Sequence, residues 1–254
     1  MRRTDKNLNK LYTALLAIGM LFWTILCGAW GLKFIFSSTA KNRNVAKKWC
    51  AGILWLAKHV MGITYEIRGQ QYIPKNAALI ASSHQSMFET MLLTVLLQNW
   101  TYVLKQELVN IPIIGFYMRK SGMIIIKRSN GVRSLRQLIA HSQTFKDPQI
   151  IIFPEGTRRK PRDHAPKMLP GVVEIYRILN LPIHPVALNS GLLWPKGMLN
   201  LRSGVITLEF LPPIPPHQDP QETRLRLKET LDKNSDRLVN ELEQKLNKES
   251  EQNA

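Results

Sequence analysis

An uncharged run of 22 residues, from Leu11 to Leu32, constrains this chain more than any other feature of its sequence. A helix of that length spans about 30 Å, the thickness of the hydrocarbon core of a bilayer. A second apolar segment follows at residues 49–63, interrupted only by Lys58 and His59. A cleaved signal peptide has a shorter apolar core and no second segment, so we expect an uncleaved membrane anchor.

Basic residues flank the uncharged run on both sides, so the charge bias that normally sets membrane orientation nearly cancels. Two arrangements stay open: a helix that crosses the bilayer, or a two-helix unit that enters one leaflet. Four tryptophans of this part suit an interfacial position: Trp23, Trp30, Trp49 and Trp55. We expect the anchor to hold the rest of the chain at the cell inner membrane, on its cytoplasmic side.

From residue 64 onward, short apolar runs alternate with helical patterns. This alternation predicts an α/β domain with a mixed, largely parallel sheet flanked by helices. We expect strands at 64–68, 79–83, 101–105, 123–127, 149–153, 182–188 and 205–210. We expect helices at 87–98, 131–145, 170–179 and 221–248. The chain then divides into an anchor at 1–63, an α/β domain at 64–220 and a C-terminal amphipathic helix and tail at 221–254.

The net charge of +17 is concentrated in two blocks. Residues 1–70 carry 11 basic and 2 acidic side chains, and residues 101–170 carry 13 basic and 4 acidic side chains. Such charge implies an anionic partner: phospholipid headgroups, nucleic acid or a phosphorylated substrate. The aromatic side chains concentrate in the anchor rather than among the basic ones, so we expect no nucleic acid. The two cysteines, Cys27 and Cys50, fit neither a zinc site nor a disulfide framework.

Three polar clusters follow predicted strands of the α/β domain. They are the pair His84 and Glu89, the pair Lys127 and Arg128, and the sequence FPEGTR at residues 153–158. Ligands of open α/β sheets bind outside the carboxyl ends of the strands. If the three strands run parallel, the clusters converge on one crevice, and we expect the site there.

The first cluster, His84 and Glu89, pairs a side chain that can act as a base with a carboxylate that can orient it. An imidazole beside a carboxylate can take the proton of a hydroxyl group, while the carboxylate holds the tautomer and stabilises the imidazolium. If the chain turns into a helix after His84, Glu89 can reach back to the ring. The H-x4-E spacing is common by chance, however, and a histidine that merely closes a strand explains this pair equally well.

FPEGTR is a more specific pattern. Pro154 ends the strand, Gly156 permits a tight turn, and Arg158 presents a planar fork suited to phosphate. Glu155 could accept a hydrogen bond from a substrate hydroxyl or hold Arg158. Lys105 ends another predicted strand and could donate to phosphate or stabilise an oxyanion. The alternative for each of these basic residues is a solvated surface side chain.

Taken in order, five blocks of the sequence resemble the motifs of the glycerolipid acyltransferases, with the bacterial 1-acylglycerol-3-phosphate acyltransferases as the nearest match. The blocks are His84-Gln-Ser-Met-Phe-Glu89, Lys105-Gln-Glu-Leu108, Gly122-Met-Ile-Ile-Ile-Lys-Arg128, Phe153-Pro-Glu-Gly-Thr-Arg158 and Leu181-Pro-Ile-His-Pro-Val-Ala187. With the flanking strands, the resemblance covers most of residues 64–211.

The resemblance implies a glycerol-3-phosphate acyltransferase-like fold and an acyl-transfer reaction. His84, oriented by Glu89, would deprotonate the sn-2 hydroxyl of lysophosphatidic acid, and that oxygen would attack the thioester of acyl-CoA or an acyl carrier protein. The product would be phosphatidic acid, with no cofactor, metal or covalent acyl-enzyme. The residues that match the family's substrate-binding motifs are Lys105, Arg128, Glu155, Gly156, Thr157 and Arg158.

The chain departs from the family at Glu89, where the family usually has aspartate. A glutamate still presents a carboxylate, so we expect the reaction to be retained, but another lysophospholipid or a lyso-aminolipid stays open as the acceptor. His184 lies in the last block without an evident acidic partner, and we interpret it as structural. Two alternatives come from other classes: a non-catalytic basic membrane-surface protein, and a metallohydrolase at His84, which lacks a second histidine at helical spacing.

Overall fold

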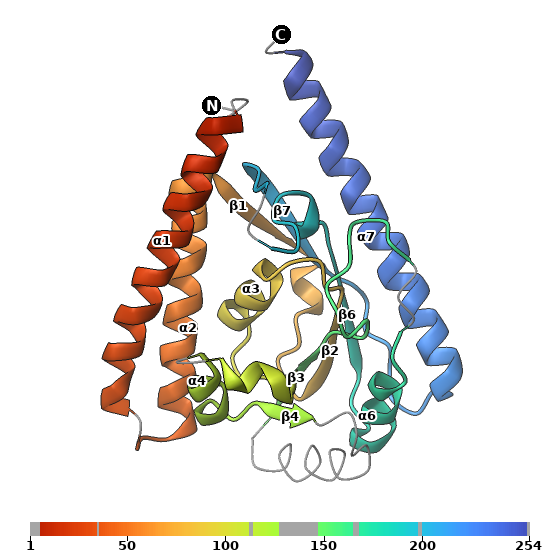
Figure 1. Ribbon diagram of the computed structural model, residues 1–254. Helices are drawn as coiled ribbons and strands as arrows, with labels where there is room; N and C mark the ends of the chain where they lie inside the picture. Colours follow the sequence, from red (N-terminus) through yellow and green to blue (C-terminus); the bar gives the residue numbers. More distant parts are fainter. Residues whose placement is uncertain are drawn as a thin grey trace.

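The protein has three layers, with a sheet in the middle and helices on both sides (Figure 1). The computed structural model describes residues 6–34, 36–111, 114–126, 147–164, 168–197 and 200–252. A helical hairpin lies along one side of the sheet, and one long C-terminal helix lies along the other. The predicted helix at 131–145, together with Lys127 and Arg128, falls outside the described residues.

The hairpin consists of α1 (Lys6–Gly31) and α2 (Thr39–Leu56), which pack side by side (Figure 1). The two helices approach closely at Gly52, where an added Cβ would lie 2.2 Å from the indole of Trp23. Among the described residues, α1 with its short extension is the one helix long and apolar enough to cross a membrane. α2 begins well before the apolar segment predicted at 49–63.

Seven strands form one sheet in the order β1-β7-β6-β2-β5-β3-β4. β6 and β7 pair antiparallel, and every other neighbouring pair of these described strands is parallel. The mixed, largely parallel sheet predicted from the sequence is therefore confirmed. The strands are β1 Ile63–Arg68, β2 Ala78–Ser82, β3 Trp100–Lys105, β4 Ile124–Ile126, β5 Gln149–Ile152, β6 Ile183–Leu188 and β7 Gly204–Phe210.

Each face of the sheet has its own hydrophobic core, because side chains alternate along a strand. In β2, Ile80 packs on the side of the hairpin, whereas Leu79 and Ala81 pack on the opposite side. The hairpin side also carries α3 (Phe88–Leu96) and α4 (Ile114–Lys120), and the opposite side carries α6 (Gly171–Leu179) and α7 (Pro220–Glu251).

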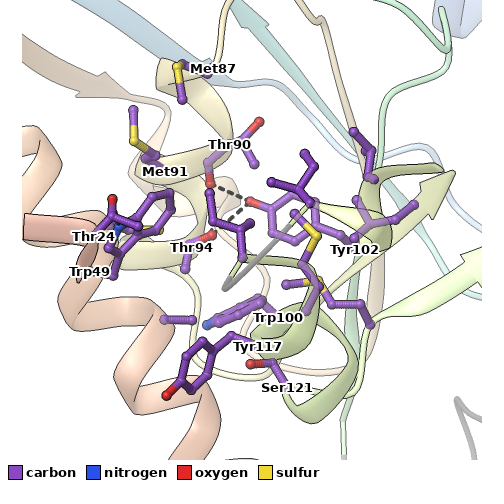
Figure 2. Close-up of a pocket in the computed structure, with 18 of the residues that line it drawn as sticks. Thr24, Trp49, Met87, Thr90, Met91, Thr94, Trp100, Tyr102, Tyr117 and Ser121 are labelled. Atoms are coloured by element: carbon purple, nitrogen blue, oxygen red, sulfur yellow. Dashed lines mark hydrogen bonds between the residues drawn. The ribbon is translucent and has the colours of Figure 1, made fainter. Parts of the chain in front are cut away.

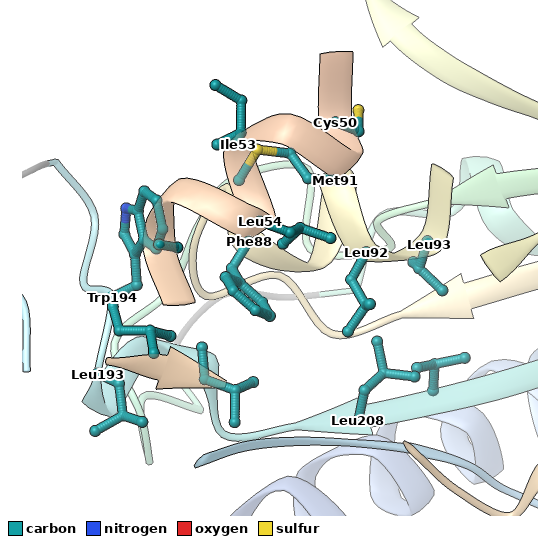
Figure 3. Packing of buried hydrophobic residues seen from close by; sticks show 14 of the residues in the cluster. Cys50, Ile53, Leu54, Phe88, Met91, Leu92, Leu93, Leu193, Trp194 and Leu208 are labelled. Carbon is teal, nitrogen blue, oxygen red and sulfur yellow. The ribbon is translucent and has the colours of Figure 1, made fainter. Parts of the chain in front are cut away.

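α3 packs between the hairpin and the sheet. This packing fixes the position of the first turn of α3. Phe88 and Leu92 are fully buried between α2 and the sheet, with Trp194 beside them (Figure 3). Burying a side chain of this size stabilises the fold by roughly 1.5–3 kcal/mol. The residue after Phe88 is Glu89, so this packing fixes the position of the carboxylate.

α7 confirms the charged C-terminal helix but corrects its buried face. Asp219 caps the helix by accepting a hydrogen bond from the backbone N–H of Glu222 at 2.8 Å. The leucine spacing of residues 221–248 predicts a buried face that includes Leu225, but Leu225 is 65% exposed and Leu227 is buried instead. The inner face therefore starts two positions later, in register with the buried Leu231 and Leu238.

Candidate active site

His84 and Glu89 lie on either side of one tight turn between β2 and α3. β2 ends at Ser82 and α3 begins at Phe88. His84 Nδ1 lies 2.9 Å from Glu89 Oε1. An ionised carboxylate only accepts hydrogen bonds, so Nδ1 carries the hydrogen and Nε2 holds the free lone pair of the neutral ring. This is the tautomer that a general base of this type requires.

Glu89 is 1% exposed and is surrounded by donors from two segments of the chain. Burial raises the pKa of its carboxyl, but hydrogen bonds and charge from His84, with hydrogen bonds from Ser86 and Ser190, outweigh burial and lower the pKa. Glu89 is therefore ionised at neutral pH. Besides His84, the donors to its carboxylate are Gln85 N at 2.7 Å, Ser86 N at 2.8 Å, Ser86 Oγ at 3.0 Å and Ser190 Oγ at 2.8 Å.

The FPEGTR loop holds His84 at its backbone and at its ring. The N–H of His84 donates to Glu155 Oε2 at 2.8 Å, and its carbonyl accepts from the N–H of Arg159 at 2.8 Å. The imidazole stacks on Phe153, with ring centroids 3.9 Å apart. β2 and β5 are parallel neighbours, so the two clusters at their carboxyl ends meet, as the strand pattern predicts.

Glu155 lies behind His84 and is 9% exposed. Its Oε1 lies 3.0 Å from Nε of Arg159, so its ionic partner is Arg159 and not Arg158. Burial raises the pKa of the Glu155 carboxyl to about 8, although Arg159 and the His84 N–H act to lower it. The structure thus places Glu155 as a support for the His84 backbone.

Of the other predicted substrate-binding residues, the structure brings Arg158 together with His84, and both line one cavity. Gly156 has a left-handed φ of 63° at the turn, a conformation that glycine adopts without strain, and Thr157 is exposed. Lys105 is the last residue of β3, next to β5 in the sheet, and its side chain is outside the described part, as is all of Arg128.

A cavity of about 320 Å³ opens beside His84 and Arg158 and extends between the hairpin and the α/β domain. Its wall is mainly apolar, and Trp49, Trp100 and Tyr117 are among the residues that line it (Figure 2). Lining residues come from α1, α2, α3, β3 and α4. One side of the cavity is therefore made of the helices that the sequence marks as the anchor.

Tyr102, which is buried, forms part of this wall, and its hydroxyl group has hydrogen-bond partners. The hydroxyl of Tyr102 donates to the carbonyl of Thr90 at 2.6 Å and lies 3.2 Å from Oγ1 of Thr94 (Figure 2). Burial raises the pKa of Tyr102 well above its usual value, so the ring stays neutral. It presents an uncharged face to the cavity.

Two other histidines of the described ranges, His184 and His59, make contacts of their own and do not line the cavity. His184 is buried, with Nδ1 2.7 Å from the carbonyl of Tyr72, and burial lowers its pKa; this arrangement fits the structural interpretation. His59 stacks on Trp55 at the surface of the hairpin. Within the described ranges, His, Cys, Asp and Glu form no group of three that could hold a metal ion.

The fold and the site define an α/β protein in which an oriented histidine faces an apolar cavity, beside helices suited to lipid. The family model for acyltransferases matches residues 64–189. The 1-acyl-sn-glycerol-3-phosphate acyltransferase of Pseudomonas aeruginosa is 34% identical over 188 residues, which are 70% of this chain and 73% of that protein. The chain therefore belongs to the acyltransferase family.

Two further comparisons extend this result. Human 1-acyl-sn-glycerol-3-phosphate acyltransferase alpha is 28% identical over 184 residues, covering 69% of this chain and 64% of the human protein. The crystal structure of the 1-acyl-sn-glycerophosphate (LPA) acyltransferase from Thermotoga maritima matches with a TM-score of 0.73, covering 92% of this chain and 98% of that one. That pair is 21% identical, so the match supports the fold.

Proposed function

We propose that the protein transfers an acyl group from acyl-CoA or an acyl carrier protein to the sn-2 hydroxyl of lysophosphatidic acid, giving phosphatidic acid. The observation that carries this proposal is that His84, paired with Glu89, lines an apolar cavity together with Arg158. The activities for which the Pseudomonas and human relatives are named support the same acceptor.

In the proposed reaction, Nε2 of His84 takes the proton of the acceptor hydroxyl as its oxygen attacks the thioester carbonyl. Glu89 stabilises the imidazolium formed in this step. The tetrahedral intermediate then collapses and expels the thiolate, which takes the proton back from His84. The new ester and a free thiol leave, and the enzyme returns to its starting state without a covalent acyl-enzyme or a bound cofactor.

The charge near the cavity suits a phosphate-bearing acceptor. Arg158 lines the same cavity as His84, where a guanidinium can hold phosphate through two parallel hydrogen bonds. We assign Lys105 and Arg128 to the same phosphate site because both match the family's motifs. The apolar part of the cavity would hold one acyl chain, since its wall offers mainly hydrophobic and aromatic contacts.

We further propose that α1 lies in one leaflet rather than across the bilayer. Both ends of the helix contact the α/β domain: Asn9 Nδ2 donates to the carbonyl of Leu201 at 3.0 Å, and Tyr117 OH donates to the carbonyl of Gly28 at 2.9 Å. A helix held at both ends lies along the domain. Its outer face is apolar and exposed, at Leu11, Leu15, Ile18, Leu21, Phe22 and Ile25.

Single cysteines at the two ends of α1 test this arrangement in sealed inner-membrane vesicles. Asn7→Cys and Phe36→Cys should react with an impermeant thiol reagent from the same, cytoplasmic side. Labelling of the two positions from opposite sides would show that the helix spans the membrane. Cys27 and Cys50 are buried and give the background signal in the parent protein.

The function itself is tested by measuring acyl transfer from acyl-CoA to a panel of lyso-acceptors with and without phosphate. We expect lysophosphatidic acid to be the preferred acceptor and His84→Ala to abolish transfer, whereas His217→Asn, at an exposed position, should keep wild-type activity. In Arg158→Ala the preference for phosphate should weaken. Preference of the wild type for a phosphate-free acceptor, or near-normal turnover in His84→Ala, would overturn the proposal.

A further inference from the structure

We propose that Asp232, on the C-terminal helix α7, is a positioning residue for His84 and acts through Arg159 and Glu155. The inference rests on the proposed function, in which His84 is the base. Neither Asp232 nor Arg159 belongs to the motifs that resemble the acyltransferase family. Their contacts connect α7 to the backbone of the catalytic turn.

The first link joins α7 to the FPEGTR loop. Nη1 of Arg159 donates to Oδ1 of Asp232 at 2.6 Å, and Nη2 lies 3.5 Å from Oγ of Ser83, the residue before His84. Arg159 is 6% exposed, so its guanidinium is almost completely removed from water. Removal of Asp232 would leave this buried positive charge uncompensated, so the position of Arg159 depends on Asp232.

The second link joins Arg159 to both peptide groups of His84. The backbone N–H of Arg159 donates to the His84 carbonyl, and the His84 N–H donates to Glu155, which forms an ion pair with Arg159. The two residues that hold His84 on either side are therefore partners of each other. A displaced Arg159 would disturb both contacts at once.

α7 also touches the catalytic turn directly. Oγ of Ser235 lies 3.0 Å from Oγ of Ser83, and both serines are buried. Ser235 is almost one turn along α7 from Asp232, so one face of the helix makes both contacts. α7 thus contacts Ser83 through the hydroxyl of Ser235. It acts on His84 through Asp232, Arg159 and Glu155.

The neighbouring cations Lys228 and Arg159 keep the carboxyl of Asp232 ionised. Burial raises the pKa of the Asp232 carboxyl, but hydrogen bonds from Lys228 and Arg159 outweigh it and lower the pKa. Without this carboxylate, Arg159 would keep only the carboxyl of Glu155 on its Nε and would be free to move toward it. A displacement of about 1 Å at a base can reduce the rate about 10²-fold.

Asp236 provides a matched control on the same helix. It lies one turn beyond Asp232, and its carboxylate contacts Nε2 of His164 at 2.9 Å; Asp232 also approaches His164, at 3.5 Å from Nδ1. Asn substitution at either position removes one negative charge from α7 and weakens the contact with the exposed His164. The two variants differ in the contact with Arg159 and in the ion pair of Asp232 with Lys228, one turn back on α7.

The test compares Asp232→Asn, Asp232→Glu and Asp236→Asn in the full-length protein, assayed with lysophosphatidic acid and one acyl-CoA. We expect Asp232→Asn to lower kcat at least tenfold with less than a threefold change in the KM for lysophosphatidic acid. Asp232→Glu should recover most of kcat, and Asp236→Asn should stay within twofold of wild type. A kcat in Asp232→Asn within twofold of that in Asp236→Asn would overturn the inference.

Thermal unfolding of each variant shows whether the fold is retained. If Asp232→Asn does not fold, Ser235→Ala replaces it, because this change removes only the hydroxyl that contacts Ser83. We expect kcat of Ser235→Ala to fall two- to fivefold at unchanged KM, and an unchanged kcat would count against the inference. A wild-type protein inactive on every lyso-acceptor would instead overturn the proposed function, and this inference with it.

Discussion

The two helical sides of the sheet contact it in different ways. The hairpin side packs through apolar side chains and encloses the cavity, with Trp49, Met91 and Trp100 among its walls. The α7 side adds ion pairs to its apolar contacts, such as Arg159 with Asp232 and Arg237 with Glu209. Apolar packing is non-directional, whereas charge-assisted hydrogen bonds fix orientation. The hairpin side therefore encloses the cavity, and the α7 side adds directional contacts that lead to the backbone of His84.

The largest effect on activity is expected at Glu89. Its buried carboxylate lies on the hairpin side of the sheet, among mostly apolar side chains. Glu89→Gln keeps the shape but loses the charge that stabilises an imidazolium, so we expect kcat to fall about 10²–10⁴-fold. Glu89→Asp keeps the charge and should retain substantial activity. Steady-state kinetics on both variants make the comparison, and equal activities would show that the charge at this position has no catalytic role.

An intermediate effect is expected inside the cavity. Cys27, on the inner face of α1, lines the cavity wall, and Cys27→Phe would occupy part of the space for an acyl chain. We expect transfer from the longest acyl-CoA accepted by the wild type to fall about tenfold more than transfer from the shortest. Overpacking of this kind costs about 1–3 kcal/mol of stability, which thermal unfolding will register.

Ile25→Phe is the matched control for this variant, because Ile25 lies on the same helix and is 52% exposed on the outer face. It should leave the chain-length profile unchanged. If both phenylalanine variants changed the profile equally, the cavity would not be the site of the acyl chain.

The smallest expected effect is a pH dependence of stability on the α7 side. Burial raises the pKa of Glu155 from 4.5 to about 8, even with Arg159 beside it. A carboxyl whose pKa is higher in the folded state contributes its full stability below its unfolded pKa and loses it as pH rises through the folded pKa. We expect the contribution of Glu155 to the free energy of unfolding to decline from about pH 4.5 to about pH 8.

Urea unfolding of the wild type and Glu155→Gln across this pH range measures that contribution as a difference. Glutamine does not titrate, so the gap between the two curves should change in favour of Glu155→Gln as pH rises. Glu241→Gln is the control, since hydrogen bonds from Arg68 and Arg237 overcome burial and lower the pKa of Glu241. The contribution of Glu241 changes only below about pH 4.5, so the gap for this variant should stay flat across this range. A gap independent of pH for Glu155→Gln would contradict the raised pKa.

Local patterns in the sequence predicted the parts of the site that depend on short separations. The His84–Glu89 contact follows from a strand that turns directly into a helix, and the meeting of His84 with residues 153–158 follows from parallel strands. Neither inference needs side-chain detail. The family resemblance added the roles of these residues, which the H-x4-E spacing alone could not distinguish from a strand-end histidine.

Other parts of the site were beyond sequence reasoning for physical reasons. The ionic partner of Glu155 is Arg159 rather than Arg158 because the left-handed turn at Gly156 redirects the chain between them. Ser190 reaches Glu89 from 101 positions away, and no local pattern marks it. The apolar residues of the hairpin have the same composition whether they face lipid, a protein core or a cavity, so the cavity wall could not be predicted.

The strand order also sets when the site can be completed during synthesis. β2, which leads into His84, pairs with β5 and β6, and these strands are translated later than β2 itself. Asp232 emerges later still, whereas α1 is made first. A nascent chain would thus expose the apolar helix α1 long before β5 and α7 are available to hold His84, so a product truncated before α7 would lack the contacts of Asp232 and Ser235 with this turn.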